Sequence, residues 1–134
     1  MSVDTVRKFY ASFAAGDAPG AFALLAPEID WTEAERGPYE GAYKGVPAVV
    51  AGVFEPLGAD FDNFAATPSE FLGDGDRVAV FGTYTGVARA TGRALKAPFV
   101  HAWTVAGGKL VRFVQHTDSA AWNAALAASA TAPA

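Results

Sequence analysis

The sequence predicts an α+β fold in which helices cover one face of a curved antiparallel sheet. Apolar residues recur with helical spacing before residue 58, whereas the second half of the chain contains runs rich in β-branched and aromatic residues. No alternation of strands and helices of the kind that builds a parallel sheet is present. With 134 residues, 51% of them hydrophobic, the chain is expected to form a single domain over residues 1–134.

Two helices are expected at the start of the chain. The first begins at the N-cap Asp4, ends at Gly16, and has an apolar stripe formed by Val6, Phe9, Tyr10 and Phe13. Asp17 caps a second, shorter helix with Pro19 in its first turn. This second helix is expected to end at Pro27 and to bury Phe22 and Leu25.

A mixed strand and loop stretch, EIDWTEAERGPYEGAYKG, precedes the most regular helical pattern of the chain. Gly45 and Pro47 suit the N-terminus of this third helix. Its apolar stripe consists of Val46, Val49, Val50, Val53, Phe54 and Leu57.

Four antiparallel strands are expected next, over residues 64–72, 77–88, 97–105 and 110–117. They are separated by GDGD, ATGR and AGGK, which favour hairpin turns. Asp118 is then expected to cap a short closing helix in SAAWNAALA. Residues 127–134 lack large side chains and are expected to form a flexible tail.

Composition argues against several classes of protein. Cysteine is absent, which excludes disulfides, thiol nucleophiles and cysteine-ligated metals. The net charge is −4 and the ten Lys and Arg residues are scattered, so nucleic acid is not an expected partner. Because no signal peptide or membrane-spanning run is recognisable, we expect a cytoplasmic protein without a membrane partner.

The order of the elements resembles the nuclear transport factor 2-like (NTF2-like) superfamily, and within it the SnoaL-like family, relatives of polyketide cyclases and ketosteroid isomerases. The matching motifs are VRKFYASFAAGD, LLAPEIDW, GPYEGAYKG, EFLGDGDRVAVFGTYTG and HAWTVAGGKLVRFVQHTD, within about residues 3–126. They are specific for the fold more than for a reaction, because this fold hosts isomerases, cyclases, epoxide hydrolases, dehydratases and binding proteins.

The resemblance implies a cone-shaped α+β barrel, in which a strongly curved, mainly antiparallel mixed sheet wraps around the N-terminal helices. A pocket opens at one end of such a cone and suits a small apolar or carbonyl-containing molecule. Members of the family usually form homodimers through the outer face of the sheet, so a homodimer is also expected.

The resemblance also implies candidate catalytic residues. The proton-transferring aspartate of ketosteroid isomerase aligns with Glu33, and its protonated aspartic acid aligns near His101. The oxyanion-binding tyrosine of that enzyme aligns with Phe9, next to Tyr10. Phenylalanine in place of this tyrosine and histidine in place of the aspartic acid both argue against steroid isomerisation. An acid-base pair of the polyketide cyclases has its counterpart in His101 together with Gln115 or Asp118.

The turn of the last hairpin decides which side chains share a face with His101. A three-residue turn with left-handed Gly108 pairs Val105 with Lys109, Trp103 with Val111, His101 with Phe113 and Phe99 with Gln115. A two-residue turn would instead place Val114 or Arg112 opposite His101. We expect the three-residue turn, with the more aromatic odd-numbered face inside and His101 near Gln115.

Burial in such a wall should make His101 less basic and Glu33 harder to ionise, so both could exchange protons with a substrate. Alternatively, His101 forms a hydrogen bond within a mixed core, and Asp118 serves as a helix cap. The large aromatic side chains expected to contact a ligand are Tyr10, Trp31, Tyr43, Phe54, Tyr84, Phe99, Trp103 and Phe113.

No metal or cofactor is expected, because His101 and His116 should face opposite sides of the sheet and no phosphate-binding motif is present. The leading hypothesis is a cofactor-free isomerase, cyclase or lyase that acts by proton transfer between Glu33, His101 and a small, mostly apolar carbonyl, polyketide-like or terpenoid compound. The alternative is a non-catalytic small-ligand-binding module or dimeric scaffold.

Overall fold

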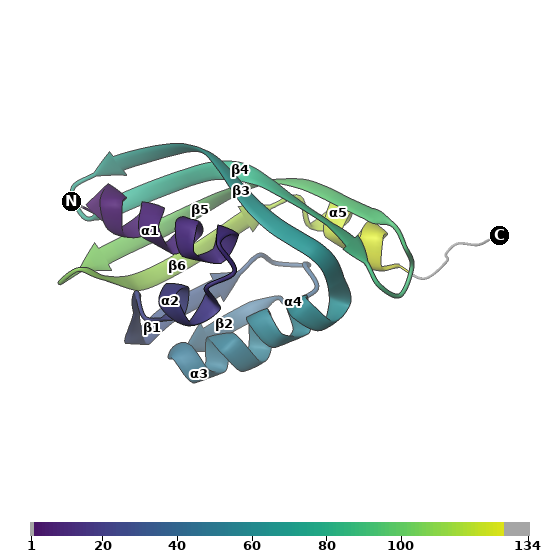
Figure 1. Cartoon of the computed structure of the whole chain (residues 1–134), viewed down its shortest axis with the longest axis horizontal. Coiled ribbons are helices and arrows are strands. Elements are labelled where there is room, and N and C mark those ends of the chain that lie inside the picture. The colour runs from purple at the N-terminus through teal and green to yellow at the C-terminus, as the bar shows by residue number, and fades with distance from the viewer. Residues whose placement is uncertain (1, 128–134) are drawn as a thin grey trace.

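The computed structural model describes residues 2–127 and confirms the α+β class (Figure 1). The helical segments are α1 (Ser2–Ala14), α2 (Ala18–Phe22), α3 (Val46–Val49), the π-helical η1 (Val50–Phe54), α4 (Glu55–Asp60) and α5 (Ser119–Leu126). The strands are β1 (Leu25–Glu33), β2 (Gly41–Lys44), β3 (Phe61–Asp74), β4 (Arg77–Ala88), β5 (Ala94–Ala106) and β6 (Lys109–Thr117). They form one curved sheet in the order β2-β1-β6-β5-β4-β3, which remains open instead of closing into a barrel.

Helix α1 packs its apolar stripe against the sheet, with Val6, Phe9 and Tyr10 buried. The helix begins at Ser2, so the expected N-cap role of Asp4 is wrong. Asp4 instead lies in the first turn, where a carboxylate is favoured by the positive end of the helix dipole. Gly16 follows the helix with a φ of 78°, the left-handed conformation that ends helices, as expected.

Helix α2 is capped as expected, because the carboxylate of Asp17 accepts a hydrogen bond of 2.9 Å from the Gly20 amide. The helix ends at Phe22, however, and its predicted extension to Pro27 is wrong. Leu25 begins β1, which pairs in parallel with β6 through Leu25 and Leu110. This long-range pairing supplies backbone hydrogen bonds that the local helical pattern could not anticipate.

The third helical region is continuous from α3 through η1 to α4, as the apolar stripe predicted. A wider π turn interrupts it next to Pro56, which has no N–H to donate to the carbonyl four residues earlier. The Glu55 amide accordingly donates to the carbonyl of Val50, five residues back. A Cβ atom at Gly52 would lie 2.2 Å from a ring carbon of Tyr43, so glycine here lets β2 approach the helix.

Strands β3 to β6 form the expected antiparallel meander, while the parallel β1–β6 pair makes the sheet mixed. Strand β4 has the predicted bounds, and the other three are longer than predicted: β3 begins at Phe61, β5 at Ala94 and β6 at Lys109. The concave face of the curved sheet encloses α1 and the segment from α3 to α4, as Figure 1 shows.

The predicted register of the last hairpin is wrong. Gly107 and Gly108, with φ values of 57° and 74°, form a two-residue turn between the paired Ala106 and Lys109. A β-bulge then inserts Val111 into β6 opposite the step from Thr104 to Val105. The extra residue pairs His101 with Gln115 and Trp103 with Phe113. The buried side of β6 is therefore even-numbered at Leu110, before the bulge, and odd-numbered at Phe113 and Gln115, after it.

Helix α5 begins at the predicted cap, where the Asp118 carboxylate accepts a hydrogen bond of 3.2 Å from the Ala121 amide. The predicted flexible tail lies outside the described residues from position 128 onward. Within residues 2–127, no helix combines the length and the apolar character needed to cross a membrane.

Candidate functional site

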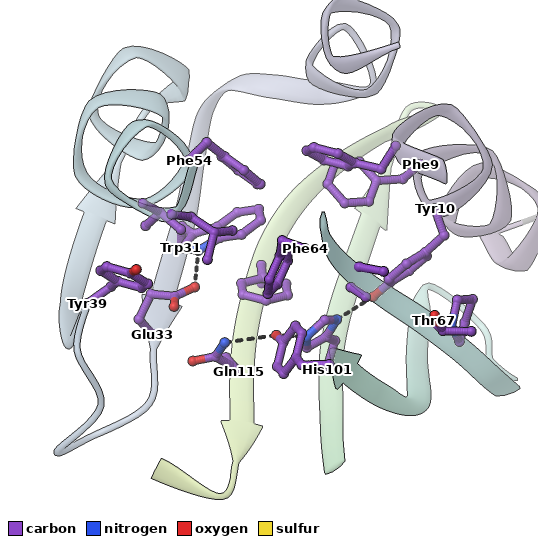
Figure 2. Close-up of a pocket in the computed structure, with 18 of the residues that line it drawn as sticks. Phe9, Tyr10, Trp31, Glu33, Tyr39, Phe54, Phe64, Thr67, His101 and Gln115 are labelled. Atoms are coloured by element: carbon purple, nitrogen blue, oxygen red, sulfur yellow. Dashed lines mark hydrogen bonds between the residues drawn. The ribbon is translucent and has the colours of Figure 1, made fainter. Parts of the chain in front are cut away.

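A cavity of about 340 Å³ lies between the concave face of the sheet and the helices (Figure 2). Aromatic and aliphatic side chains make up most of its wall, and a few polar groups face inward from different strands. These polar side chains are Tyr10, Glu33, Tyr39, Thr67, Tyr84, His101 and Gln115. An apolar hollow with a few convergent polar groups is the usual form of a site for a small organic ligand.

Glu33 reaches the cavity because it ends β1, in which Ile29, Trp31 and Glu33 alternate on the buried face. The indole N–H of Trp31 donates a hydrogen bond of 2.7 Å to Oε2 of Glu33. Glu33 is only 6% exposed. Burial raises the pKa of Glu33 from 4.5 to about 7, although hydrogen bonds from Trp31 and Gln115 partly oppose this effect. Near neutral pH, Glu33 therefore populates both its protonated and its ionised form.

His101 lies in the middle of β5, deep in the opposite wall, and is held on both ring nitrogens. Its Nδ1 lies 2.5 Å from the hydroxyl oxygen of Tyr10, and its Nε2 lies 2.5 Å from that of Tyr84. The imidazole ring stacks on Phe99, with ring centroids 4.0 Å apart. Burial lowers the pKa of His101 well below 6.5, so the imidazole is neutral at pH 7.

Each tyrosine that contacts His101 also accepts a hydrogen bond from a second side chain. The indole N–H of Trp103 donates to the Tyr10 oxygen at 2.9 Å, and Nε2 of Gln115 donates to the Tyr84 oxygen at 2.8 Å. Burial raises the pKa of both tyrosines above the ordinary value of 10.0. The two hydroxyls therefore stay protonated, and this part of the wall carries no charge.

Gln115 connects the two halves of the polar site. Its Oε1 accepts a hydrogen bond of 3.0 Å from the backbone amide of Ala34, next to Glu33, while its Nε2 faces Tyr84. Figure 2 shows Glu33 on one side of the cavity, His101 on the other and Gln115 between them. The cavity thus places a titratable carboxyl group opposite an uncharged set of hydroxyl and imidazole groups.

Most of the residues predicted from sequence lie in this wall. The cavity brings together Glu33, His101 and Gln115 with the aromatic residues Tyr10, Trp31, Phe54, Tyr84, Trp103 and Phe113. Three predicted residues lie elsewhere. Asp118 caps α5, Tyr43 donates its hydroxyl hydrogen to the Tyr39 carbonyl, and Phe99 stacks behind His101 without lining the cavity.

Sequence reasoning missed a substantial part of the wall. Tyr39 comes from the loop after β1, and Phe64 and Thr67 come from β3, whose bulges break the alternation that would have marked them. Trp122 projects from α5, where the apolar face of the capped helix was the available signal. The other lining residues not predicted are Phe9, Phe13, Ala14, Val53, Leu57, Ala65, Ala66 and Pro68.

The acidic and histidine side chains do not form a metal centre in the part of the chain that the structure describes. No three His, Cys, Asp or Glu residues there are grouped closely enough to hold an ion. The chemistry that this arrangement supports is proton transfer and hydrogen bonding to a bound molecule.

The chain belongs to the SnoaL-like domain family, since the family model matches residues 6–113. An uncharacterized protein of Mycobacterium tuberculosis (strain ATCC 25618 / H37Rv) is 30% identical over 122 residues, which cover 89% of this chain and 91% of that protein. The family and the NTF2-like superfamily inferred from sequence motifs are thereby confirmed.

Two solved structures illustrate how widely the fold is shared. An NTF2-like protein from Burkholderia thailandensis is 32% identical, with a TM-score of 0.88 over 92% of this chain and 95% of that chain. TerC, co-crystallized with polyporic acid, is 25% identical, with a TM-score of 0.83 over 93% of this chain and 97% of that chain.

Proposed function

We propose that this SnoaL-like protein binds a small, largely apolar molecule in the conical cavity and catalyses cofactor-free proton transfer on it. The reaction would be of the isomerase, cyclase or lyase type. The observation that carries the proposal is Glu33, a buried carboxyl group on an aromatic cavity wall whose pKa is raised to about 7. A carboxyl group with this pKa takes and returns protons near neutral pH, which is the property a general acid-base catalyst needs.

The neighbouring residues would have distinct roles in this reaction. Glu33 would exchange a proton directly with the ligand, while Trp31 and Gln115 would orient its carboxyl group through their N–H donors. His101 would act through Tyr10 and Tyr84, because both of its ring nitrogens are occupied by their hydroxyl groups. The aromatic walls would exclude water and hold the apolar part of the ligand.

The comparison with TerC supports a small organic ligand for this cavity. That protein was co-crystallized with polyporic acid, and it shares the fold and 25% of its sequence with this chain. The cavity of about 340 Å³ is within the size range of sites for small organic molecules.

Hydrogen exchange into candidate ligands tests the proposal. Purified protein would first be examined by native mass spectrometry for a retained molecule, and ketones would then be incubated with it in D₂O and followed by NMR. The wild type should accelerate C–H exchange, and Glu33→Gln should reduce the rate by about 10²-fold or more. Glu28→Gln, an exposed carboxyl group on the same strand, is the matched control and should retain the rate. Equal rates for Glu33→Gln and the wild type would exclude Glu33 as the catalytic group.

A non-catalytic binding module is the second candidate. It is favoured by the observation that Glu33, His101 and Gln115 already have hydrogen-bond partners within the protein. A retained ligand that binds the wild type and Glu33→Gln equally well, without hydrogen exchange or turnover in either, would support this function over catalysis.

We also propose that the protein forms a homodimer through the outer face of its sheet, as family membership suggests. Sedimentation equilibrium measures this directly, since the chain mass is 13.9 kDa. A mass of a single chain at micromolar concentration would contradict the proposal.

A further inference from the structure

A buried chain of hydrogen bonds runs from Trp103 through Tyr10, His101 and Tyr84 to Gln115. The direction of the two end bonds is fixed. The indole nitrogen of Trp103 has only a hydrogen to offer. Gln115 must direct its NH₂ group at Tyr84, because its carbonyl oxygen already accepts from the Ala34 amide. Tyr10, His101 and Tyr84 make up the central segment of this chain. Each tyrosine oxygen therefore accepts one hydrogen bond from a residue outside the central segment.

The central segment contains more hydrogens than it can use. Tyr10 and Tyr84 each carry one hydroxyl hydrogen, and the neutral imidazole of His101 carries one N–H. These three hydrogens serve two contacts, Tyr10 with Nδ1 and Tyr84 with Nε2. One hydroxyl hydrogen is therefore left without an acceptor in the chain.

The tautomer of His101 decides which tyrosine has the unused hydrogen. With the hydrogen on Nε2, Tyr10 donates to Nδ1 and the hydroxyl hydrogen of Tyr84 is free. With the hydrogen on Nδ1, Tyr84 donates to Nε2 and the hydroxyl hydrogen of Tyr10 is free. Both tyrosines line the cavity, and within residues 2–127 neither hydroxyl has a further hydrogen-bond partner. One tyrosine can thus donate a hydrogen bond to a molecule in the cavity, and the oxygen of the other tyrosine can accept one.

We propose that Tyr10, His101 and Tyr84 form a hydrogen relay, and that the ligand is a hydroxy-carbonyl or enol-carbonyl compound with its carbonyl oxygen at one tyrosine and its hydroxyl group at the other. The proposal rests on the proposed function in so far as a small molecule must occupy the cavity. A ligand with two carbonyl groups would leave one of them without a donor, since the relay has a single hydrogen to give. A hydroxy-carbonyl compound satisfies both ends.

The relay can also move a proton across a conjugated ligand without creating a charge. The ligand hydroxyl gives its proton to the Tyr10 oxygen as the Tyr10 proton moves to Nδ1. The Nε2 proton of His101 moves to the Tyr84 oxygen, and the Tyr84 proton moves to the carbonyl oxygen of the ligand. One proton leaves the ligand and one returns, so the enol and carbonyl ends exchange while His101 changes tautomer. Burial disfavours any charged intermediate in this segment, consistent with a neutral shift.

Binding of three matched probes tests the ligand class. 4-Hydroxyacetophenone has one donor and one acceptor group, 4-methoxyacetophenone lacks the donor, and 1,4-diacetylbenzene has two acceptors. By calorimetry at pH 6, the wild type should bind the hydroxy probe about tenfold more tightly than either of the others, the value of one additional hydrogen bond. Tyr10→Phe and Tyr84→Phe should abolish this preference. Tyr43→Phe, which removes a hydroxyl outside the cavity, should preserve it.

Nitrogen-15 NMR of histidine-labelled wild type tests the relay without any substitution. The chain has two histidines, and His116 is exposed, so the buried His101 is readily assigned. Bound 4-methoxyacetophenone should shift the Nδ1 and Nε2 resonances of His101 in opposite directions, toward a single tautomer.

The outcomes separate the two proposals. Unchanged His101 resonances with a bound probe, or equal affinities for all three probes, would overturn the relay and leave the ligand-binding cavity standing. Binding of none of the probes would overturn the ligand class and count against the proposed function as well.

Discussion

Glu33 should make the stability of this protein fall as the pH rises from 4 to 8. Its pKa is 4.5 in the unfolded chain and about 7 in the folded protein, because burial disfavours the carboxylate. The folded state therefore holds the proton more tightly than the unfolded state does. The stabilisation from this proton is complete below pH 4.5 and is lost as the pH rises through about 7.

The size of the effect follows from the same two values. At about 1.4 kcal/mol per pKa unit, the difference between 4.5 and about 7 corresponds to about 3 kcal/mol of unfolding free energy. This is a large part of the 5–15 kcal/mol that is roughly typical of whole domains. Glu33→Gln replaces the carboxyl group with a neutral group of the same shape and should remove this pH dependence.

Urea unfolding at a series of pH values measures the effect. The difference in unfolding free energy between the wild type and Glu33→Gln should fall by about 3 kcal/mol from pH 4 to pH 8. Glu28→Gln, on the exposed face of the same strand, should give a difference that does not follow this curve. Parallel stability curves for the wild type and Glu33→Gln would refute the argument that Glu33 is buried and hard to ionise.

Three further predictions concern other parts of the chain. Burial lowers the pKa of His101 below 6.5, so the wild type should lose stability relative to His101→Asn as the pH falls below 6.5. Urea unfolding should show a loss of up to about 1.4 kcal/mol per pH unit. A difference between the two proteins that stays constant with pH would contradict this. Gly52→Ala should lower the unfolding free energy by about 1–3 kcal/mol, because the added Cβ would lie 2.2 Å from the Tyr43 ring. The control Gly58→Ala places its Cβ in open space within a helix and should raise the melting temperature. Asp118→Ala should lower the unfolding free energy by about 1 kcal/mol through loss of the α5 cap, and an unchanged value would mean that the cap does not stabilise the folded state.

Much of the site follows from periodicity in the sequence. Alternation along β5 predicts that His101 and Trp103 share the inner face, and the structure agrees. Glu33 was identified through family resemblance, and the alternation of β1 places it inside. The face to which each of these side chains points depends only on its position along its own strand, because successive residues of a strand point to opposite faces of the sheet.

Other features depend on contacts between distant parts of the chain. The bulge at Val111 sets the partner of His101, although neither the turn sequence nor the pattern of β6 reveals it. The pairing of β1 with β6 ends α2 early and brings Ala34 to the carbonyl oxygen of Gln115. The position of the bulge and the pairing of β1 with β6 both depend on which backbone hydrogen bonds can form together in the complete sheet.

The sequence by itself determined the α+β class, the order of elements, the SnoaL-like family and the inward direction of His101, because these depend on local spacing and on motifs. Only the tertiary structure decided that both nitrogens of His101 bind tyrosine hydroxyls and that Gln115 links them to the strand of Glu33. The physical reason is that a buried polar group must find its partner in three dimensions, and the partners of His101 lie 91 and 17 residues away along the chain.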